Sequence, residues 1–376
     1  MKQKVLLIAE SLGGGLRKHV VQLIEGLDDE KFDVFLIHGT LSVDNVFQEK
    51  KKDLEKKAVL IECPHLVREI NPSEDISAYN FISQWIKTNK PDVVHLHSSK
   101  AGVIGRMAAK RRGVKKVFYT PHAYSFQAKE FSKKKKALFI FIERFLSRYA
   151  TTKTFNVSEG EKEAALQVNI DKPDKFQVIY NGLPEIELPT KKEARDILGL
   201  SQEAFIIGNN ARLSEQKDPL TFVKIAKEVV KENSKALFVW VGDGPLQDEV
   251  EKYIDENNLQ KNVKLLGFRE DSELIVSAYD IFLLTSLYEG LPYAPIEALR
   301  AGVPVVATDV TGNREVVKNT VNGLLYKQND IDQAASSIVC LQNDLMNIID
   351  QYNLSMDYVD RFSIKKMMKQ IKLEYL

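Results

Sequence analysis

The amino-acid sequence predicts an α/β protein made of two Rossmann-like, doubly wound domains. Three observations lead to this fold class. Short apolar runs rich in Val, Ile, Leu and Phe recur along the chain, longer stretches of helical periodicity lie between them, and the alternation continues through both halves. Continuous apolar runs bounded by Gly, Pro or Asp are typical of parallel strands that helices cover on both faces.

The expected elements follow in chain order. In the first half, apolar runs predict strands at Val5–Ala9, Phe32–His38, Val93–Leu96, Val117–Thr120 and Phe176–Ile179. In the second half, further runs predict strands at Phe205–Gly208, Ala236–Val241, Val263–Leu265, Ile281–Thr285 and Val303–Ala307. Apolar residues at helical spacing predict helices at Leu16–Leu27, Ile76–Thr88, Pro219–Glu232 and Leu246–Asn257.

A domain boundary is expected where the alternation pauses. Residues 181–189 contain two prolines and one glycine and have no clear periodicity, which is typical of a linker. We therefore expect an N-terminal domain over residues 1–182 and a C-terminal domain over residues 183–350. Residues 331–376 are almost wholly helical in pattern and contain no Gly or Pro. The last part, residues 351–376, is expected to pack back on the N-terminal domain.

Composition excludes several classes of protein. The apolar fraction of 44% is ample for real cores, so overall disorder is ruled out. Cys63 and Cys340 are too few for a disulfide framework or a cysteine-ligated zinc site. The first apolar run is too short for a signal-peptide core, and no stretch reaches the ~18 apolar residues of a membrane span. We expect a cytoplasmic protein with reduced thiols.

A glycine run follows the first predicted strand. Gly14 and Gly15 let the backbone approach a ligand closely, and they direct N–H groups toward an anion near a helix N-terminus. The run matches neither G-x-G-x-x-G nor a Walker loop, so a tight turn without a ligand is the alternative.

Three histidines lie at the ends of two other predicted strands. His95 and His97 share a strand face, and His122 follows the next strand, so the three could in principle surround a metal ion. No carboxylate or cysteine lies nearby at ligand spacing, and we therefore expect no metal site. His95 is interpreted as a core histidine, and His97 and His122 as candidates for sugar or phosphate contacts.

Two loops of the second half also follow strands. Arg212 and Lys217, five residues apart, can neutralise a diphosphate, Arg as a fork and Lys as a point charge. A solvated charged loop is the alternative. Gly242 opens a Gly-Asp-Gly-Pro turn at the end of another strand, and the turn is as consistent with a structural role as with ligand approach.

The most informative segment reads SLYEGLPYAPIEALRAGVP. Glu289 and Glu297 are eight residues apart, and the turn Gly290, Leu291 and Pro292 stands between them before a helix start. Backbone N–H groups at such a start can hold a phosphate. Carboxylates accept hydrogen bonds from hydroxyl groups. The segment therefore fits a ligand that carries both sugar hydroxyls and phosphates.

This E-x7-E segment, with Gly-x-Pro inside it and Ala-Gly-Val-Pro-Val after it, resembles the signature of retaining glycosyltransferases with the GT-B fold, in the large family numbered four. The glycine run, His122, Arg212 with Lys217, and the Gly-Asp-Gly-Pro turn fall in the family's order, so the resemblance spans nearly the whole chain. The phrases Glu-Ser-Leu-Gly-Gly-Gly and Thr-Pro-His-Ala-Tyr-Ser-Phe resemble enzymes that build bacterial capsular and exopolysaccharide repeat units.

The resemblance implies two domains facing each other across a cleft, with a nucleotide-sugar donor in the C-terminal domain and the acceptor in the N-terminal domain. It implies that Glu297 binds the ribose hydroxyls and Glu289 the hydroxyls of the donor sugar. Arg212, Lys217 and the amides around Leu291 would stabilise the diphosphate leaving group.

The remaining site residues also follow from the resemblance. Gly14 and Gly15 would approach the same phosphates from the other domain, with His122 near the sugar. The expected catalytic residues are thus Glu289, His122, Arg212 and Lys217. The expected donor-binding residues are Gly14, Gly15, Gly242, Gly290, Leu291, Pro292 and Glu297.

A metal-free mechanism that retains anomeric configuration is expected, with front-face attack as in the family. The D-x-D match at Asp330–Asp332 opens a helix and is interpreted as a cap. No cofactor and no metal are expected, because the nucleotide-sugar is a substrate. Arg300 stands where the family usually has a small residue and could touch the nucleotide or face solvent. Asn313 follows Gly312 where a second glycine is common.

The formal charge of +1 hides an asymmetry between the two halves. The first 182 residues hold 31 Lys and Arg against 22 Asp and Glu, a balance of +9, and the remainder has −8. Lys133–Lys136 precede the bulky apolar stretch Ala137–Ile142, which suits docking on an anionic membrane surface. A core-packed helix with a solvated lysine end is the alternative. Nucleic acid is not an expected partner, because no recognised binding module is present.

The sequence therefore predicts a retaining glycosyltransferase, peripheral on the inner face of the plasma membrane, that uses a lipid-diphosphate-linked saccharide acceptor. UDP is favoured as the donor nucleotide on family frequency. Two other functions compete with this one: a nucleotide-sugar epimerase of GT-B shape, and a non-catalytic partner subunit of another glycosyltransferase. The presence of both glutamates, Arg212 and Lys217 argues against the partner role.

Overall fold

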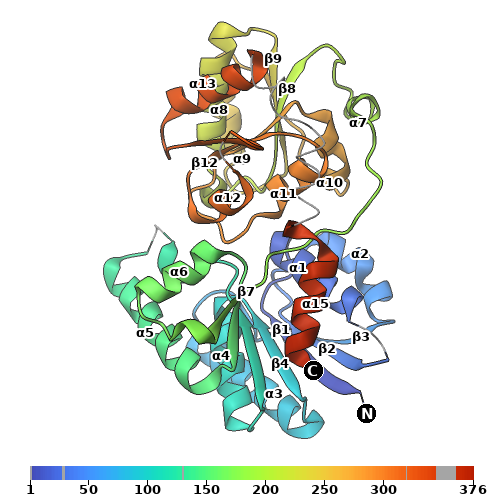
Figure 1. The fold of residues 1–376 in the computed structure, drawn as a ribbon, viewed down its shortest axis with the longest axis vertical. Coiled ribbons are helices and arrows are strands. Elements are labelled where there is room, and N and C mark those ends of the chain that lie inside the picture. Colours follow the sequence, from blue (N-terminus) through green and yellow to red (C-terminus); the bar gives the residue numbers. More distant parts are fainter. Residues whose placement is uncertain (1, 28–29, 129–130, 319, 344–360) are drawn as a thin grey trace. The chain divides into compact units, whose positions relative to one another are not determined.

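The computed structural model describes residues 2–27, 30–128, 131–318, 320–343 and 361–376 (Figure 1). The chain forms two units of α/β architecture. The first comprises residues Met1–Gly182 together with Ile364–Leu376, and the second comprises Leu183–Ser363. Residues 361–363, which were expected to pack on the N-terminal domain, thus belong to the second unit.

The first unit is built on a sheet in which all paired strands are parallel. Its strands are β1 (Gln3–Ala9), β2 (Phe32–His38), β3 (Ala58–Glu62), β4 (Val93–His97), β5 (Lys116–Thr120), β6 (Lys153–Asn156) and β7 (Phe176–Val178). They lie in the order β3-β2-β1-β4-β5-β6-β7. Its α-helices are α1 (Gly14–Gly26), α2 (Asn45–Leu54), α3 (Pro72–Asn89), α4 (Ser99–Arg111), α5 (Lys133–Ala150), α6 (Glu159–Gln167) and α15 (Ile364–Tyr375).

Two apolar cores lie on the two faces of this sheet. Val5 and Leu7 of β1 belong to one core, with residues of α1 and α15, whereas Leu6 and Ile8 belong to the other, with residues of α3 and α4. Successive side chains of a strand point to opposite faces. A strand covered on both sides must therefore be apolar throughout, which explains the continuous apolar runs in the sequence.

The C-terminal helix α15 is part of the first unit. Met367, Ile371 and Tyr375 are buried in its core. The Tyr375 hydroxyl hydrogen-bonds to His95 Nδ1 at 2.6 Å, and Lys153 Nζ forms an ion pair with Glu374 Oε1 at 2.6 Å. Of the expected helical stretch 331–376, residues 344–360 lie outside the described residues.

The second unit has a smaller parallel sheet, in the order β10-β9-β8-β11-β12-β13. Its strands are β8 (Phe205–Asn210), β9 (Ala236–Val241), β10 (Val263–Leu265), β11 (Ile281–Leu284), β12 (Val305–Thr308) and β13 (Gly323–Tyr326). Its α-helices are α7 (Lys191–Leu198), α8 (Pro219–Glu232), α9 (Gln247–Glu256), α10 (Ser272–Ile275), α11 (Tyr293–Arg300), α12 (Thr311–Val316) and α13 (Ile331–Asn343). The Asp330 carboxylate accepts the Gln333 N–H at 3.0 Å, which confirms the expected cap on α13.

The doubly wound fold predicted from the sequence is confirmed in both units, but three strands escaped prediction. β3 and β13 lie at sheet edges. β3 has the burial pattern of a strand that is partly solvated, and β6 is only four residues long. Length and edge position alone do not account for these misses, because β7 and β10 are three residues long, lie at sheet edges and were predicted.

Parallel strands bring the loops at their carboxyl ends to one edge of each sheet. In such sheets a ligand crevice forms where the chain winds away in opposite directions from two adjacent strands. These strands are β1 and β4 in the first unit, and β8 and β11 in the second. The helices in the part of the chain that the structure describes are each too short or too polar to cross a bilayer.

The Tyr375–His95 hydrogen bond provides a test of how α15 is held. Tyr375→Phe leaves His95 Nδ1 buried without its partner and should lower the free energy of unfolding by about 1–3 kcal/mol. Urea denaturation of the full chain measures the loss, with exposed Tyr149→Phe as the matched control. Equal stability of the two variants would contradict this role.

Candidate functional site

The loops after β8 and β11 meet through a pair of opposite charges. Lys217, at the end of a short 3-10 helix before α8, forms an ion pair with Glu289, which lies between β11 and α11. Glu289 is buried, with 8% of its surface exposed, and the Lys217 side chain is 21% exposed. The structure thus brings together two site residues that are 72 positions apart in the chain.

Hydrogen bonds to backbone carbonyl groups hold these two loops in register. The Thr285 hydroxyl donates toward the carbonyl of Lys217 at 2.7 Å. The Gln216 side-chain amide donates to the carbonyl of Tyr288 at 3.0 Å, and the Leu287 N–H donates to the carbonyl of Gln216 at 2.8 Å. Because the backbones on both sides of the ion pair are tied, the two charged side chains are positioned before any ligand binds.

The loop after β12 supports the Glu289 segment from the other side. A Cβ atom on Gly312 would lie 2.5 Å from the Gly290 carbonyl oxygen and 2.9 Å from Glu289 Cβ, so only glycine allows this approach. Asn313, where the family commonly has glycine, is buried, and its amide donates to the Thr308 carbonyl at 2.9 Å. Asn313 therefore stabilises the loop that follows β12.

The turn Gly290–Pro292 leads directly into α11. Pro292 is the N-cap of this helix, and its side chain has no acceptor atom that could cap the N–H groups of the first turn. Glu297 is the fifth residue of α11 and is 7% exposed. Burial, and next the Glu297 carboxylate, raise the pKa of Tyr293 well above its ordinary value. The arrangement places the helix start and both glutamates on one short segment.

Arg300 contacts other residues of the second unit. Its side chain is buried, with one guanidinium nitrogen donating to the Pro184 carbonyl at 3.1 Å and another 3.4 Å from a Glu273 carboxylate oxygen. The expectation that Arg300 faces solvent is therefore wrong, and its contact with a nucleotide stays a prediction. The side chain ties the start of the second unit to its helices.

Arg212 and Gly242 lie on neighbouring loops of the same edge. Arg212 is exposed, at the opposite end of the β8 loop from Lys217. A Cβ atom on Gly242 would lie 2.1 Å from the Ala211 carbonyl oxygen, and φ of Gly242 is 132°. Glycine is thus required at 242 by the packing of the β8 and β9 loops, whatever a ligand adds.

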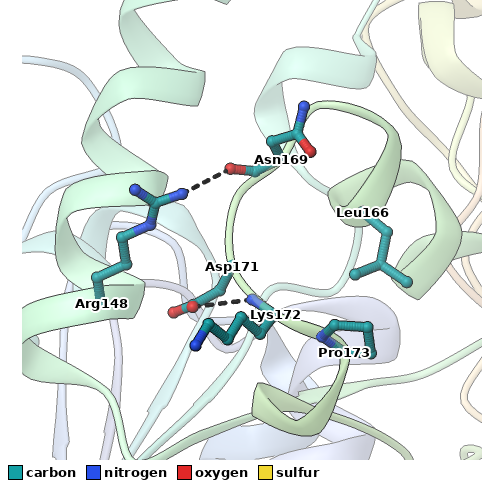
Figure 2. Close-up of a pocket in the computed structure, with 6 residues that line it drawn as sticks. All are labelled: Arg148, Leu166, Asn169, Asp171, Lys172 and Pro173. Carbon is teal, nitrogen blue, oxygen red and sulfur yellow. Dashed lines mark hydrogen bonds between the residues drawn. The ribbon is translucent and has the colours of Figure 1, made fainter.

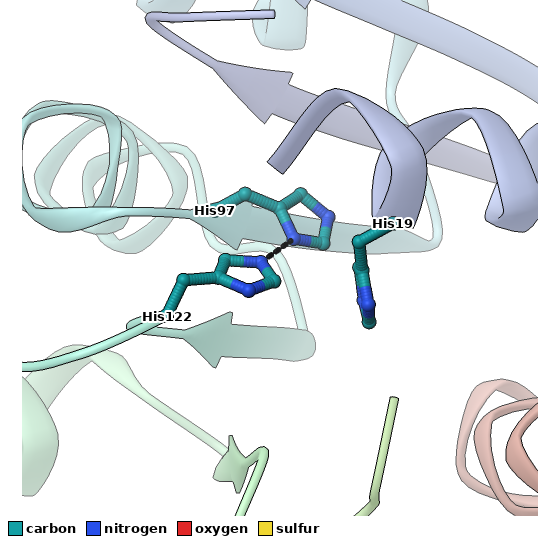
Figure 3. A group of neighbouring side chains, drawn as sticks. All are labelled: His19, His97 and His122. Atoms are coloured by element: carbon teal, nitrogen blue, oxygen red, sulfur yellow. Dashed lines mark hydrogen bonds between the residues drawn. The ribbon is translucent and has the colours of Figure 1, made fainter. Parts of the chain in front are cut away.

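In the first unit, three histidine rings gather at the carboxyl edge of the sheet (Figure 3). His97 Nδ1 and His122 Nε2 are 3.3 Å apart, and the His19 ring packs edge-on against His122 with 4.7 Å between centroids. His19 Nδ1 lies 3.1 Å from the Asn181 side-chain oxygen, to which it donates. The Nε2 atom of His19 therefore keeps its lone pair.

Burial keeps these imidazoles neutral. It lowers the pKa of His19 to about 4, although the Asn181 hydrogen bond acts in the opposite sense. Burial likewise lowers the pKa values of His97 and His122, each with a smaller contribution from neighbouring histidines. Neutral rings can both donate and accept hydrogen bonds, which suits contact with sugar hydroxyl groups.

The histidine group considered for a metal differs from the one that the structure assembles. Both ring nitrogens of His95 are bonded, to Tyr375 and to Thr120, so His95 is a core histidine as expected. His19 takes its place, and the ligand nitrogens of His19, His97 and His122 lie within 4.8 Å of one another. A tetrahedral zinc ion needs nitrogens ~3.3 Å apart, so the rings would have to move closer to hold one.

A buried carboxylate holds the loop that carries His122. His122 and Ala123 have φ angles of 54° and 84°, a conformation that L-residues rarely adopt. Glu161 Oε1 accepts the Ala123 N–H at 2.6 Å, and Oε2 accepts the Val157 N–H at 2.9 Å. Burial raises the Glu161 pKa, which these hydrogen bonds partly offset.

The sequence contained signals for the residues that its interpretation left out. Ser158 and Glu161 form an S-x-x-E pattern, and the Ser158 hydroxyl accepts the Glu161 N–H at 3.1 Å. His19 is a polar residue on the buried side of the amphipathic helix α1. Neither pattern by itself reveals the long-range contacts, to Ala123 and to Asn181, that give these residues their roles.

The glycine run binds a carboxylate of the chain itself. The Gly14 N–H donates to Asp44 Oδ2 at 3.1 Å, and Arg17 pairs with the same carboxylate at 3.0 Å. Gly14 has a φ of 56°, and a Cβ atom there would meet nothing within 4 Å. Gly14 and Gly15 are both exposed. Their backbone is thus open to a ligand, although one N–H group already has an anionic partner.

A surface pocket of the first unit is separate from these residues (Figure 2). Its lining consists of Arg148, Leu166, Asn169, Asp171, Lys172 and Pro173. Arg148 donates to the Asn169 carbonyl at 3.3 Å, which closes one side of the pocket. None of the site residues expected from the sequence lines it.

Comparison with known proteins connects both units to sugar transfer. Residues 190–347 match the family described as "Glycosyl transferases group 1", and residues 13–185 match "Glycosyltransferase Family 4". An Escherichia coli relative, UDP-Gal:alpha-D-GlcNAc-diphosphoundecaprenol alpha-1,3-galactosyltransferase, is 33% identical over 374 residues, covering 96% of this chain and 93% of its own. The putative glycosyltransferase EpsD of Bacillus subtilis is 26% identical and covers 68% of this chain and 69% of its own.

Solved structures share the two-unit fold. HepE of Anabaena in complex with UDP and glucose aligns with a TM-score of 0.82 at 21% identity, over 100% of both chains. Sucrose-phosphate synthase of Thermosynechococcus elongatus aligns with a TM-score of 0.84 at 18% identity, over 100% of this chain and 98% of its own.

The neutral state of His19 predicts a pH dependence of stability. A histidine whose folded pKa is below its unfolded value of about 6.5 destabilises the fold as pH falls through the window from 6.5 toward 4, since only the unfolded chain binds the proton. At pH 5.5 the cost for His19 is about 1.4 kcal/mol. His19→Gln should remove this cost in stability, because glutamine does not titrate and can keep the hydrogen bond to Asn181.

Thermal unfolding at pH 7.5 and 5.5 measures this difference. Between pH 7.5 and 5.5, the Tm of the wild-type protein should fall by about 3–5 °C more than the Tm of His19→Gln. Glu161 contributes equally to both proteins. The pKa values of the buried His95, His97 and His122 rise when His19 is replaced, which adds to the difference in the same direction. Equal decreases in the Tm of the two proteins would show that His19 is not held neutral.

Proposed function

Since the chain belongs to the group 1 and family 4 glycosyltransferases, we propose that it transfers a sugar from a UDP-sugar to a lipid-diphosphate-linked saccharide, in the assembly of a polysaccharide or glycoconjugate. The Escherichia coli relative, which is 33% identical over nearly the whole chain, is named for a UDP-galactose donor and a diphosphoundecaprenol acceptor. The UDP complex of HepE, which has the same fold, is consistent with this donor.

The observation that carries this proposal is the ion pair of Lys217 and Glu289. A nucleotide-sugar presents a diphosphate next to a sugar ring. Lys217 would exchange its carboxylate partner for the diphosphate, and the released Glu289 carboxylate would accept hydrogen bonds from the sugar hydroxyls. Exposed Arg212 would reach the same phosphates, and Glu297 would bind the ribose.

The remaining site residues have roles in the same proposal. The first turn of α11, with Gly290, Leu291 and Pro292 at its start, would direct N–H groups at the leaving phosphate. Gly14 and Gly15 would bind phosphate with their exposed backbone in the first unit, and Gly242 would keep the β8 loop of the second unit in place. His122, neutral and held by Glu161, would contact sugar hydroxyl groups in the first unit.

The chemical step breaks the bond between the anomeric carbon and the phosphate oxygen and forms a bond from that carbon to an acceptor hydroxyl oxygen. The bonding electron pair leaves with UDP, and the acceptor proton passes to the departing phosphate oxygen. Attack from the same face retains the anomeric configuration. Lys217, Arg212 and the α11 amides would stabilise the negative charge that develops on UDP, so we propose that no metal ion is needed.

A transfer assay tests the proposal against the two competing functions. The full chain is incubated with UDP-, GDP- and dTDP-sugars, with and without a synthetic lipid-diphosphate-linked N-acetylglucosamine, in the presence of EDTA. We expect release of UDP that requires the acceptor, and a product that keeps the anomeric configuration of the donor. Conversion of the donor without acceptor would instead indicate an epimerase, and no turnover with any donor would indicate a partner subunit.

Glu289→Gln tests the residue at the centre of the proposal. The amide keeps the shape of the side chain but is a weaker acceptor for sugar hydroxyls and cannot hold Lys217. We expect kcat to fall by about 10²–10³-fold with the fold intact. Exposed Glu249→Gln on α9 is the matched control and should keep full activity. Activity of Glu289→Gln within threefold of wild type would remove this carboxylate from the mechanism.

A further inference from the structure

Helix α5 presents a line of large apolar side chains to solvent. Leu138, Phe141, Phe145 and Tyr149 are 53%, 65%, 52% and 61% exposed. They are spaced three or four positions apart, so they form one stripe along the helix. Phe145 and Tyr149 also contact each other, with 5.0 Å between ring centroids. We refer to these four residues as the apolar stripe.

The opposite face of α5 fixes the orientation of the stripe. Glu143 is buried and accepts hydrogen bonds from Arg106 at 2.8 Å and from the Tyr119 hydroxyl at 3.2 Å. Leu146 and Ala150 are buried on the same side. Turning the stripe inward would expose these apolar residues and break a buried ion pair, so it remains on the surface.

Four lysines stand at the N-terminal end of the helix. Lys133–Lys136 occupy the first turn, where positive charges oppose the helix dipole and repel one another. The sole acidic residue of α5 is the buried Glu143. Lys135 is held beside aromatic rings, 4.0 Å from the centroid of Phe131. This clustering of positive charges is unfavourable for the isolated helix. Attraction to a negatively charged surface would make it favourable.

The position of the lysines connects them with the candidate site. Helix α5 follows β5, whose last residue is Thr120, and leads into β6. Its N-terminus therefore lies at the carboxyl edge of the sheet, the edge that carries His97 and His122. A surface bound at Lys133–Lys136 would lie on the side of the first unit where the acceptor is proposed to bind.

We propose that α5 docks the protein on an anionic lipid bilayer, with the apolar stripe at the boundary of headgroups and acyl chains and Lys133–Lys136 on the lipid phosphates. This proposal deepens the proposed function, on which it rests for the link to a lipid-linked acceptor. A basic face beside exposed aromatic residues is the pattern of interfacial helices. A second copy of this face offers no exposed acid on α5 to the lysines, and a nucleic acid offers no place for a continuous apolar stripe.

Co-sedimentation with vesicles tests the docking directly and needs no turnover. The full chain is mixed with phosphatidylcholine vesicles that contain either no phosphatidylglycerol or 30% of it, in ~0.1 M salt. We expect binding to the anionic vesicles alone. Changing Lys133, Lys134, Lys135 and Lys136 to Gln should weaken it more than tenfold, because each lysine contributes about fivefold. Phe141→Ser with Phe145→Ser should also weaken it more than tenfold.

Matched controls change the same chemistry elsewhere in the first unit. Lys50, Lys52, Lys56 and Lys57 are exposed on or just after α2, where acidic residues are interspersed, and their change to Gln removes the same charge. Leu41 and Ile70, 76% and 68% exposed, are the controls for the two phenylalanines. Both control proteins should bind anionic vesicles within threefold of wild type. Circular dichroism verifies the fold of every variant.

Three outcomes would overturn the docking proposal: no binding of wild type to anionic vesicles, equal binding by the α5 variants, or equal loss in the controls. Conversion of a dimer to a monomer by the α5 changes, with vesicle binding intact, would assign the face to a second copy instead. Vesicle binding that depends on α5, in a protein without transferase activity, would contradict the proposed function and leave the docking in place.

Discussion

The ion pair of Lys217 and Glu289 is the interaction that joins the loops after β8 and β11, on which the proposed donor site depends. It takes two opposite charges largely out of water, which is favourable only when their positions are held accurately. The Thr285 hydroxyl, the Gln216 amide and the glycine at 312 provide that accuracy by fixing the loops on either side. The buried Asn313 extends the same support to the end of β12. A site prepared in this way can exchange the internal pair for a ligand that carries both phosphates and hydroxyls.

The two units share one strand topology but carry different side chains at the carboxyl edge of the sheet. In each, the chain leaves two adjacent parallel strands in opposite directions, and loops from both strands meet at the carboxyl edge. The second unit places charged side chains there, which suits a diphosphate. The first unit places three neutral imidazoles there, with Glu161 holding the strained residues His122 and Ala123 in position. The division is consistent with the proposal that the second unit binds the donor and the first unit binds the saccharide part of the acceptor.

The sequence was sufficient for the fold class, and it singled out the candidate site residues of the second unit, because both depend on local patterns. Buried parallel strands require continuous apolar runs, and Glu289, Glu297 and the turn between them lie within nine residues. The contacts of His19 with Asn181 and of Glu161 with Ala123 join distant segments, so no local pattern reports them. The burial of Arg300 was missed for the same reason, since its partners Pro184 and Glu273 are 116 and 27 residues away.

The central claim is that Lys217 binds the diphosphate of the donor whereas its partner Glu289 binds the sugar. Calorimetric titration of UDP, which lacks the sugar, separates the two roles. Lys217→Gln should weaken UDP binding at least tenfold, equivalent to about 1.4 kcal/mol, and Glu289→Gln should leave it within threefold of wild type or tighten it. Equal weakening by both substitutions, or unchanged affinity in Lys217→Gln, would contradict the account.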